Sequence, residues 1–341
     1  MESRSPARLA GFPREIPHEN SGEKTIDCVL CGSCVVDILV RPVPLEEPIG
    51  GGRLLETDPV EVTTGGIVSN AGIALARLGQ KVAAFSYVGP DDWAEMIRKR
   101  LGQEGVDVQS LITLPDGATS TTAVLVDSTG ERSFAHCVGA PKRMDKATFL
   151  NHLDLFARSR LMLLGYYSLM PLLEPDLPEI FAAIRQTGCR TALDAAGSGG
   201  GLQPLARILP HLDVYVPSLA EAQHQTGCQE PEQILQVYRD SGAPGLLGIK
   251  LGSQGALLSP SPGELLPVAT VAPPGDVVDT TGAGDAFYAG LLCGLLRGLD
   301  IGAASRLAAA TGACCVTALG ASAGLRGFAE TARVAGLEPA G

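Results

Sequence analysis

The feature that most constrains the fold is a regular alternation of helical and extended segments in the second half of the chain. From residue 145 onward, four expected helices each precede an expected strand. The helices cover 145–157, 176–186, 202–209 and 230–240, and the strands cover 160–164, 190–194, 212–216 and 245–250. Strands separated by helices of this length form βαβ units, which build a mainly parallel sheet with helices on both faces. We therefore expect an α/β fold.

The rest of the chain has the same character. A chain of 341 residues, 45% of them hydrophobic, can bury the core of one large domain, which we place at 25–335. Two hairpins are expected, one joining 121–126 to 132–135 and one joining 255–258 to 264–268. The remaining expected elements are strands over 26–36 and 81–88 and helices over 71–78, 93–101, 284–297 and 301–317.

Two early segments, 38–63 and 119–139, interrupt the alternation. The first holds short extended pieces at 53–55 and 60–62, and the second holds the first hairpin. Neither segment is long enough to be a domain of its own. We expect them to pair as a small β-sheet lid inserted in the larger domain, and we expect residues 1–24 to form a disordered tail.

The charge of the chain excludes some classes of partner. A net charge of −11 and an isoelectric point near 5.0 argue against nucleic-acid binding, which needs a basic surface. The longest apolar stretch, Ala286–Leu296, is shorter than a membrane span, and residues 1–24 carry no signal-peptide core. We expect a soluble, cytoplasmic protein that binds neither nucleic acid nor a membrane.

Nine cysteines in a chain without an export signal favour reduced thiols. Cys28, Cys31 and Cys34 are spaced like iron–sulfur ligands, but they lie in a segment that is typical of a buried strand. Side chains alternate along a strand, so Cys31 should point away from the other two. No fourth cysteine follows at ferredoxin spacing. We therefore interpret these cysteines as small core residues.

A glycine-rich loop, Asp279-Thr-Thr-Gly-Ala-Gly-Asp-Ala-Phe287, leads into an apolar helix that begins near Ala283. Backbone N–H groups at a helix start lack partners and attract phosphate oxygens, and Gly282 and Gly284 have no Cβ to hinder a close approach. Asp285 places a carboxylate at the same point, where it can take the proton of a substrate hydroxyl. This arrangement suits phosphoryl transfer.

An ordinary loop with an acidic residue at the helix start would have the same pattern. Two other nucleotide-binding motifs are absent from the sequence, namely Gly-x4-Gly-Lys-Ser/Thr and a Gly-x-Gly-x-x-Gly that opens a helix after a strand. From the loop alone, a small-molecule kinase and an ordinary loop both remain open.

The nine-residue stretch is similar to the C-terminal signature of the PfkB (ribokinase-like) family of sugar and nucleoside kinases. The stretch Thr64-Gly-Gly-Ile-Val-Ser-Asn-Ala-Gly-Ile-Ala-Leu-Ala-Arg-Leu-Gly79 resembles the first signature of the same family. The two matches stand in the family's order, and the resemblance extends over roughly 26–330. It implies a ribokinase-like fold, a mainly parallel central sheet flanked by helices, with a small β-sheet lid.

The resemblance also implies roles for individual residues. Asp285 corresponds to the catalytic base, and the amides of Gly282, Ala283 and Gly284 to an anion hole. The expected substrate-binding residues are Asp37, Gly65, Gly66, Asn70 and His136. The expected nucleotide-binding residues are Lys250, Gly252, Gly255, Ser218 and Glu221. Asp279, Thr281, Val316 and Gly320 correspond to a monovalent-cation loop, which would hold K⁺.

Several of these positions have a second interpretation or depart from the family. Ser218 stands where the family carries an Asn, so a hydroxyl replaces an amide near the expected Mg²⁺. Ile67 replaces the Lys of ribokinases proper, which argues against a strict preference for ribose. His136 could instead be a polar residue on a sheet face, and Lys250 could be a solvated strand end.

Taken together, the signatures predict ATP- and Mg²⁺-dependent transfer of a γ-phosphate to a hydroxyl of a sugar or sugar-like alcohol. A nucleoside kinase on the same scaffold is one alternative, although 38–63 contains no aromatic residue on which a base could stack. A non-catalytic sugar-binding protein is another, against which the presence of Asp285 argues. The resemblance further suggests a homodimer formed through the lid.

Overall fold

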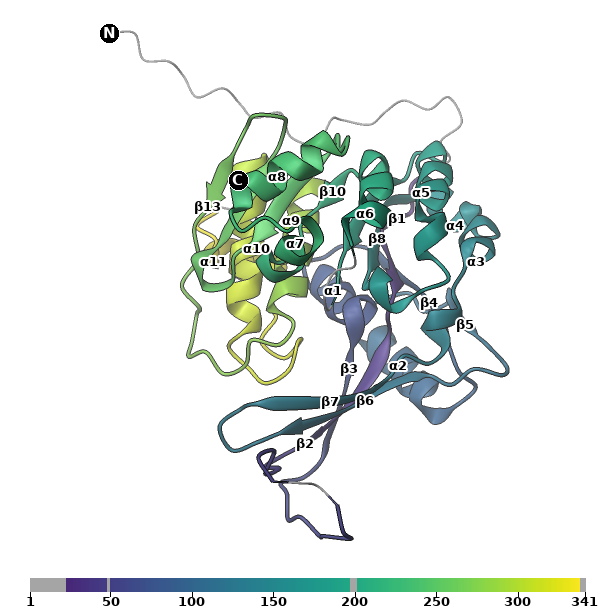
Figure 1. The fold of residues 1–341 in the computed structure, drawn as a ribbon, viewed down its shortest axis with the longest axis vertical. Coiled ribbons are helices and arrows are strands. Elements are labelled where there is room, and N and C mark those ends of the chain that lie inside the picture. The colour runs from purple at the N-terminus through teal and green to yellow at the C-terminus, as the bar shows by residue number, and fades with distance from the viewer. Residues whose placement is uncertain (1–22, 48–49, 197–200, 338–341) are drawn as a thin grey trace.

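A nine-stranded sheet forms the centre of the molecule in the computed structural model, which describes residues 23–47, 50–196 and 201–337 (Figure 1). The strand order is β13-β12-β11-β10-β9-β8-β1-β4-β5. The sheet is parallel except for β12, which runs antiparallel to both of its neighbours, β11 and β13. The strands are β1 (Ile26–Gly32), β4 (Val82–Val88), β5 (Leu111–Thr113), β8 (Ser159–Gly165), β9 (Arg190–Asp194), β10 (Val214–Tyr215), β11 (Leu246–Lys250), β12 (Ala256–Ser259) and β13 (Leu266–Val268).

Helices cover both faces of this sheet, and each face has its own hydrophobic core. One core packs against α1 (Gly66–Arg77), α2 (Asp92–Gln103), α9 (Ala283–Leu296), α10 (Ile301–Cys315) and α11 (Phe328–Val334). The other packs against α3 (Lys146–Leu150), α4 (Leu153–Ala157), α5 (Leu177–Gln186), α6 (Leu202–Ile208), α7 (Leu219–Thr226) and α8 (Pro231–Asp240). None of the helices in the described part of the chain is long and apolar enough to cross a lipid bilayer.

The two cysteines of β1 and the cysteine that follows it, Cys34, are divided between the two cores. Cys28 and Cys34 belong to one core and Cys31 to the other. The prediction that Cys31 points away from its neighbours is therefore confirmed. All three thiols are buried, and burial raises the pKa of each, which keeps them protonated and unreactive.

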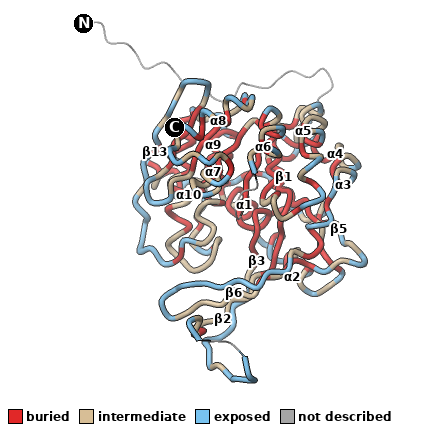
Figure 2. Tube along the Cα trace, in the orientation of Figure 1, coloured by how far each residue is buried: buried red, intermediate tan, exposed pale blue. Residues whose placement is uncertain are grey.

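A second, four-stranded sheet projects from one edge of the body, and we call it the lid (Figure 1). Its order is β3-β2-β6-β7, formed by β2 (Val35–Val40), β3 (Glu61–Gly65), β6 (Ser120–Val126) and β7 (Arg132–Cys137). The predicted hairpin of β6 and β7 is confirmed. Every residue of β7, an edge strand of the lid, is exposed, and Figure 2 shows the lid as mostly exposed or half-buried beside the mostly buried main sheet. The lid therefore has a face that is free to cover a ligand.

Four expectations about the elements are wrong in detail. The single strand over 26–36 is two strands, because Gly32 turns the chain out of the main sheet at a φ of +116°. The single helix over 145–157 is divided into α3 and α4, because His152 leaves helical geometry at a φ of −125°. Residues 53–55 form no strand, and the predicted helix over 71–78 begins five residues earlier, at Gly66. The helices α7 and α11 were not expected.

Candidate active site

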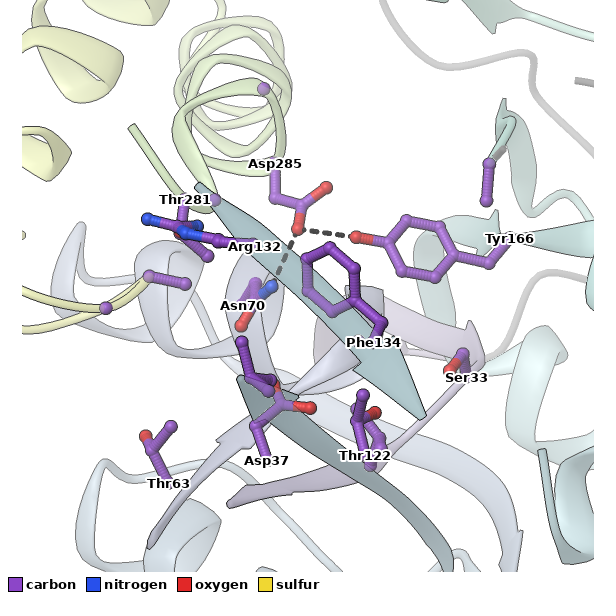
Figure 3. A pocket seen from close by; sticks show the side chains of 18 of the residues that line it. Ser33, Asp37, Thr63, Asn70, Thr122, Arg132, Phe134, Tyr166, Thr281 and Asp285 are labelled. Carbon is purple, nitrogen blue, oxygen red and sulfur yellow. Dashed lines mark hydrogen bonds between the residues drawn. The ribbon is translucent and has the colours of Figure 1, made fainter. Parts of the chain in front are cut away.

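A cavity of about 750 Å³ lies between the lid and the carboxyl ends of the central strands. Its floor comes from the residues that follow β1, β8, β9 and β11, because parallel strands end at the same edge of a sheet. Its roof comes from the inner face of the lid, and one wall comes from the start of α9. Figure 3 shows residues from all three parts pointing into the same space.

Asp285 lies at the centre of this arrangement, in the first turn of α9. Its Oδ2 accepts a hydrogen bond from Asn70 Nδ2 at 2.8 Å and another from the Tyr166 hydroxyl at 2.9 Å (Figure 3). Burial raises the pKa of the Asp285 carboxyl, although Asn70, Lys250 and Tyr166 all favour its ionised form. A carboxylate with a raised pKa is a better proton acceptor than an exposed one.

Tyr166 is held in an unusual backbone conformation. It is the one residue other than glycine with a positive φ among the described residues, at φ 60° and ψ 38°. Its amide donates to the Asp194 carbonyl at 3.1 Å. Non-glycine residues rarely adopt this conformation without compensation, and such residues gather at functional sites. The conformation directs the Tyr166 hydroxyl across the cavity to Asp285 (Figure 3).

The start of α9 is the place where an anion hole is predicted. Gly282 precedes the helix in the left-handed region at φ 75°, and a Cβ there would lie 2.4 Å from the Cβ of Ala321. Gly282 and Gly284 line the cavity. Ala283 does not line it, and its amide donates to the Thr280 carbonyl at 3.2 Å. Of the three predicted anion-hole residues, the structure brings two to the cavity surface.

Lys250 reaches the same helix start from the end of β11. Its Nζ lies 3.1 Å from Asp194 Oδ1 and 5.6 Å from the centre of the Tyr288 ring. The missing Cβ of Gly284 would lie 3.6 Å from the same Nζ. Lys250 is therefore a largely buried, paired cation beside the predicted anion hole, and not a solvated strand end.

The charges around Lys250 determine its protonation. Burial acts to lower the pKa of Lys250, but Asp194, Glu221 and Asp285 together raise it above its ordinary value. Burial raises the pKa of the Asp194 carboxyl, and the Lys250 ammonium opposes that shift. We conclude that this lysine stays positively charged inside the cavity.

Three polar residues form a row across the inner face of the lid. Asp37 pairs with Thr122 between β2 and β6, and Thr122 pairs with His136 between β6 and β7. Thr122 Oγ1 and His136 Nδ1 are 2.9 Å apart. Burial raises the pKa of Asp37, against lowering effects of Thr122 and His136. All three residues line the cavity, so the row presents hydrogen-bonding groups to it.

The predicted substrate-binding residues near the start of α1 are arranged around the same row. Gly65 leaves room for the Asp37 carboxylate, since a Cβ there would lie 2.0 Å from Oδ2. Gly66 takes a φ of +75° next to the Ser33 carbonyl, where a Cβ would lie 2.5 Å away. The buried Oδ1 of Asn70 has no hydrogen-bond partner among the described residues, so it is available to a ligand.

The lid face also carries apolar side chains. Phe134 lines the cavity and is 62% exposed. Leu39, Val124 and Val126 line it as well. The segment 38–63 indeed lacks aromatic residues, but the second lid segment supplies one. A flat or apolar part of a ligand therefore has a surface on which to pack.

Ser218 and Glu221, predicted near the nucleotide, form a capping box at the start of α7. The Glu221 amide donates to Ser218 Oγ at 3.4 Å, and the Ser218 amide donates to Glu221 Oε2 at 2.8 Å. Both residues line the cavity. The spacing Ser-x-x-Glu is a local signal for a helix start that the sequence already contained. It would have predicted α7.

The remaining nucleotide-binding predictions have different outcomes. Gly252 lines the cavity at a φ of +60°. Gly255 does not line it, and it lies so close to β13 that a Cβ would be 2.0 Å from the Val268 carbonyl oxygen. Gly255 therefore shapes the turn after β11, and of the two glycines only Gly252 reaches the cavity surface.

The expected monovalent-cation loop is closed by hydrogen bonds from the protein. Asp279 Oδ1 accepts the Thr281 amide at 2.9 Å and the Thr281 hydroxyl at 2.7 Å, and Oδ2 accepts the Gly320 amide at 2.8 Å. Arg132, from the lid, forms an ion pair with the same carboxylate and also donates to Thr281 Oγ1. Val316 lies behind this loop and does not line the cavity.

The cavity residues that sequence reasoning missed include Thr122, Arg132, Phe134, Tyr166 and Asp194. Asp194 ends β9 and Tyr166 follows β8, and polar residues at the ends of buried parallel strands are a general signal for ligand sites. Thr122, Arg132 and Phe134 carry no such signal, because their importance depends on which face of the lid turns inward.

Comparison with known proteins identifies relatives over most of the chain. The model of the pfkB family carbohydrate kinases matches residues 27–326. A ribokinase of Haemophilus influenzae is 26% identical over 82% of this chain and 90% of its own length. A fructokinase of Klebsiella pneumoniae is 32% identical over 77% of this chain and 82% of its own length.

Solved structures show the same fold. An Escherichia coli protein described as ribokinase II superposes with a TM-score of 0.77 at 21% identity, and the match covers 91% of this chain and 98% of that protein. At this level of identity the likeness establishes the ribokinase-type architecture, with its main sheet and its lid.

Proposed function

The chain belongs to the pfkB family of carbohydrate kinases, and from that premise we propose that it transfers the γ-phosphate of ATP to a hydroxyl of a sugar or sugar-like alcohol, with Asp285 as the general base. One observation carries the proposal. The buried Asp285 carboxylate is oriented by Asn70 and Tyr166 at the start of α9, opposite the polar row of the lid. A base and a phosphate-binding helix start thus share one cavity.

The nucleotide is assigned to the side of the cavity formed by α9 and β11. Backbone amides in the first turn of α9 have no carbonyl partner within the helix and can donate hydrogen bonds to phosphate oxygens. The Lys250 ammonium beside Gly284 adds a fixed positive charge there. The E. coli ribokinase II was solved with ATP and Mg²⁺, which supports assigning the same ligands to this chain.

The residues present fit a magnesium–nucleotide complex. Glu221 lines the cavity with one carboxylate oxygen held by the Ser218 amide, which orients the group. Carboxylates and water suit Mg²⁺, and the ion, when bound, would neutralise charge on the transferring phosphate. Ser218 offers its hydroxyl to the same region, although α7 already uses it as a cap. The ion would therefore be held by Glu221 and by the nucleotide itself.

The acceptor alcohol is assigned to the lid side. Asn70 Oδ1, Asp37 and the Thr122–His136 pair offer acceptors and donors that match the hydroxyls of a sugar. Asp285 would take the proton of the attacking hydroxyl, while the lid excludes water and prevents hydrolysis of the nucleotide. Sugar hydroxyls are thus the chemistry that this surface recognises.

A nucleoside is the second candidate acceptor. The exposed ring of Phe134 lines the cavity with Leu39 and Val124 around it, and a base could stack there. The substrate site is more polar near Asp37, which is why we place a sugar first. The same ribose-type hydroxyls would meet Asp285 in both cases.

The test is a coupled assay of ADP release over pentoses, hexoses, sugar acids and nucleosides, with Mg²⁺ and with or without K⁺. We expect turnover with at least one sugar class and a dependence on Asp285. ADP release that no added alcohol stimulates would contradict the proposal. Stimulation by nucleosides alone would favour the second candidate.

Two further expectations belong to this proposal. A homodimer through the lid is supported by three exposed apolar residues, Leu54 and Val60 before the lid strand β3 and Val62 within it. A cytoplasmic location is supported by the cysteines, since all nine lie in described positions and remain unpaired there. Size-exclusion chromatography with light scattering would measure the first. The proposed function includes no K⁺ site, because protein donors already surround Asp279.

A further inference from the structure

The Asp279 carboxylate is surrounded by hydrogen-bond donors of the protein, whereas a carboxylate that binds a cation keeps an oxygen available to it. Oδ1 accepts from the Thr281 amide, the Thr281 hydroxyl and the Arg132 guanidinium, and Oδ2 accepts from the Gly320 amide. The side chain of Asp279 is 3% exposed. These hydrogen bonds outweigh the effect of burial and lower the pKa of Asp279 to about 2. The carboxylate is therefore ionised, and its negative charge is already matched by Arg132.

The carbonyl oxygens around this carboxylate are occupied as well. The Val316 carbonyl accepts the amides of Val278 at 2.8 Å and Asp279 at 3.3 Å, which uses both of its lone pairs. The Thr281 carbonyl accepts the Cys315 thiol at 3.5 Å. Gly320 turns its amide, a donor, toward the site. The residues expected to hold K⁺ therefore do not fit that ion in this arrangement.

The positive charge at this position comes from the tip of the lid. Asp127 Oδ1 accepts the amides of Thr129 and Glu131, which fixes the tight turn between β6 and β7. The turn places Arg132 as the first residue of β7, opposite Val126. From there its side chain crosses to the loop before α9, as Figure 3 shows for Arg132 and Thr281. The contact between Arg132 and Asp279 joins residues 147 positions apart.

We propose that the Arg132 guanidinium takes the place of a monovalent cation at the Asp279–Thr281 loop, so that closing the lid completes the phosphate-binding end of the site. The inference rests on the proposed kinase function. Thr281 is adjacent to Gly282, where the anion hole begins, and its hydroxyl is held between Arg132 and Asp279. Opening the lid withdraws the guanidinium and leaves the buried Asp279 carboxylate without its counter-charge.

This arrangement links two events that must occur together in phosphoryl transfer. A lid that is open exposes the cavity to water, and a loop without its counter-charge holds its backbone amides less firmly. A planar guanidinium binds a carboxylate and a hydroxyl at once through donors held in a fixed fork. A spherical ion or a lysine ammonium does not reproduce that fixed geometry. Arg132 is thus a positioning residue, since it acts on the loop and not on the substrate.

The test compares four proteins, the parent, Arg132→Gln, Arg132→Ala and Arg53→Gln. Arg53 is a matched control. It lies in the connection between the lid strands β2 and β3 and also forms an ion pair, but its partner, Glu47, lies in the same connection and not in the loop before α9. Each protein is assayed in KCl and in tetramethylammonium chloride at equal ionic strength. Thermal unfolding is measured in both salts, and hydrogen–deuterium exchange is followed over 120–137.

For the parent we expect the same turnover and the same melting temperature in both salts. Arg132→Gln should lose about tenfold or more in turnover, the effect of losing hydrogen bonds to a charged group. Its hairpin should exchange faster than that of the parent, while Arg53→Gln should match the parent in both measurements. Added guanidinium ion should restore part of the activity of Arg132→Ala.

Two results would overturn the inference. One is a several-fold activation or a clear thermal stabilisation of the parent by K⁺ relative to tetramethylammonium. The other is hairpin exchange in Arg132→Gln that equals that of Arg53→Gln. If the parent phosphorylates none of the alcohols offered, the proposed function fails, but the melting and exchange measurements still decide whether Arg132 holds the loop.

Discussion

Asn70 Nδ2 and Asp285 Oδ2 lie 2.8 Å apart, although the two residues are separated by 215 positions in the chain. Asn70 lies in α1, directly after the lid strand β3, and Asp285 lies in the first turn of α9. The hydrogen bond joins the proposed substrate end of the cavity to its proposed phosphate end. Asn70 Oδ1 has no hydrogen-bond partner among the described residues, so one amide can orient the carboxylate and contact a ligand at once.

The first prediction concerns the carboxylate itself. Asp285→Asn should lower turnover by roughly 10²–10⁴-fold, because an amide cannot accept the proton of the attacking hydroxyl. Binding of a non-hydrolysable ATP analogue, measured by calorimetry, should stay within a few-fold of the parent. Near-parental turnover of the variant would refute the assignment of the base.

The second prediction concerns Tyr166. Its hydroxyl stabilises the ionised form of Asp285, so Tyr166→Phe should raise the pKa of that carboxyl. We expect the acid limb of the pH profile of kcat/KM to move to higher pH by about one unit. Tyr87→Phe is the control, because it removes a tyrosine hydrogen bond to Thr148 outside the site. An unshifted profile for Tyr166→Phe would show that its hydroxyl does not act on the base.

The third prediction concerns the buried pair of Lys250 and Asp194. Lys250→Met should cost roughly 3–5 kcal/mol in the free energy of unfolding above neutral pH, where it leaves a buried, ionised carboxylate without a partner. The pKa of Asp194 is already raised to about 7 beside the Lys250 ammonium, and removing that charge raises it further. The variant therefore takes up the proton at a higher pH than the parent, and the cost should shrink as the pH falls toward about 7. Urea unfolding at a series of pH values from mildly alkaline down to neutral measures this. A cost that does not change with pH would contradict the buried charge.

The fourth prediction concerns Asp279, whose pKa is lowered to about 2 from an ordinary 3.8. A lowered folded-state pKa stabilises the fold above the ordinary value, and that stability is lost as the pH falls toward the folded-state pKa. Asp279→Asn should therefore cost about 2 kcal/mol near neutral pH, and the difference from the parent should diminish below about pH 4. Denaturant unfolding at a series of pH values is the measurement, and a constant difference down to the lowest pH would contradict it.

The fifth prediction uses a pair of glycines. A Cβ on Gly65 would lie 2.0 Å from Asp37 Oδ2, so Gly65→Ala should displace that carboxylate. We expect KM for the sugar to rise about tenfold or more, the effect of a displaced hydrogen bond to a charged group, while KM for ATP changes little. Gly72→Ala in α1 is the control, because its nearest contact would be an ordinary 3.8 Å from Leu30. Equal KM values for the two variants would remove Asp37 from the substrate site.

Much of the fold could be predicted because its signals are local. The alternation of elements, the hairpin of β6 and β7 and the apolar α9 each depend on residues close together in the chain. The helix start at Gly282 and Asp285 could be predicted for the same reason. The capping box of Ser218 and Glu221 was an equally local signal, and interpreting it would have revealed α7. Where the strand over 26–36 breaks at Gly32 depends on the distant Gly165, whose carbonyl leaves no room for a side chain.

Local sequence patterns are thus enough to predict the fold class, the lid, and the loop in which Asp285 stands beside two glycines. The surroundings of that carboxylate depend instead on how distant segments pack. Tyr166, Arg132 and Lys250 reach the cavity because parallel strands end at one edge and the lid turns a single face inward. Hydrogen bonds and ion pairs require atoms a few ångströms apart, and that proximity is set by how the elements pack, which no local pattern encodes.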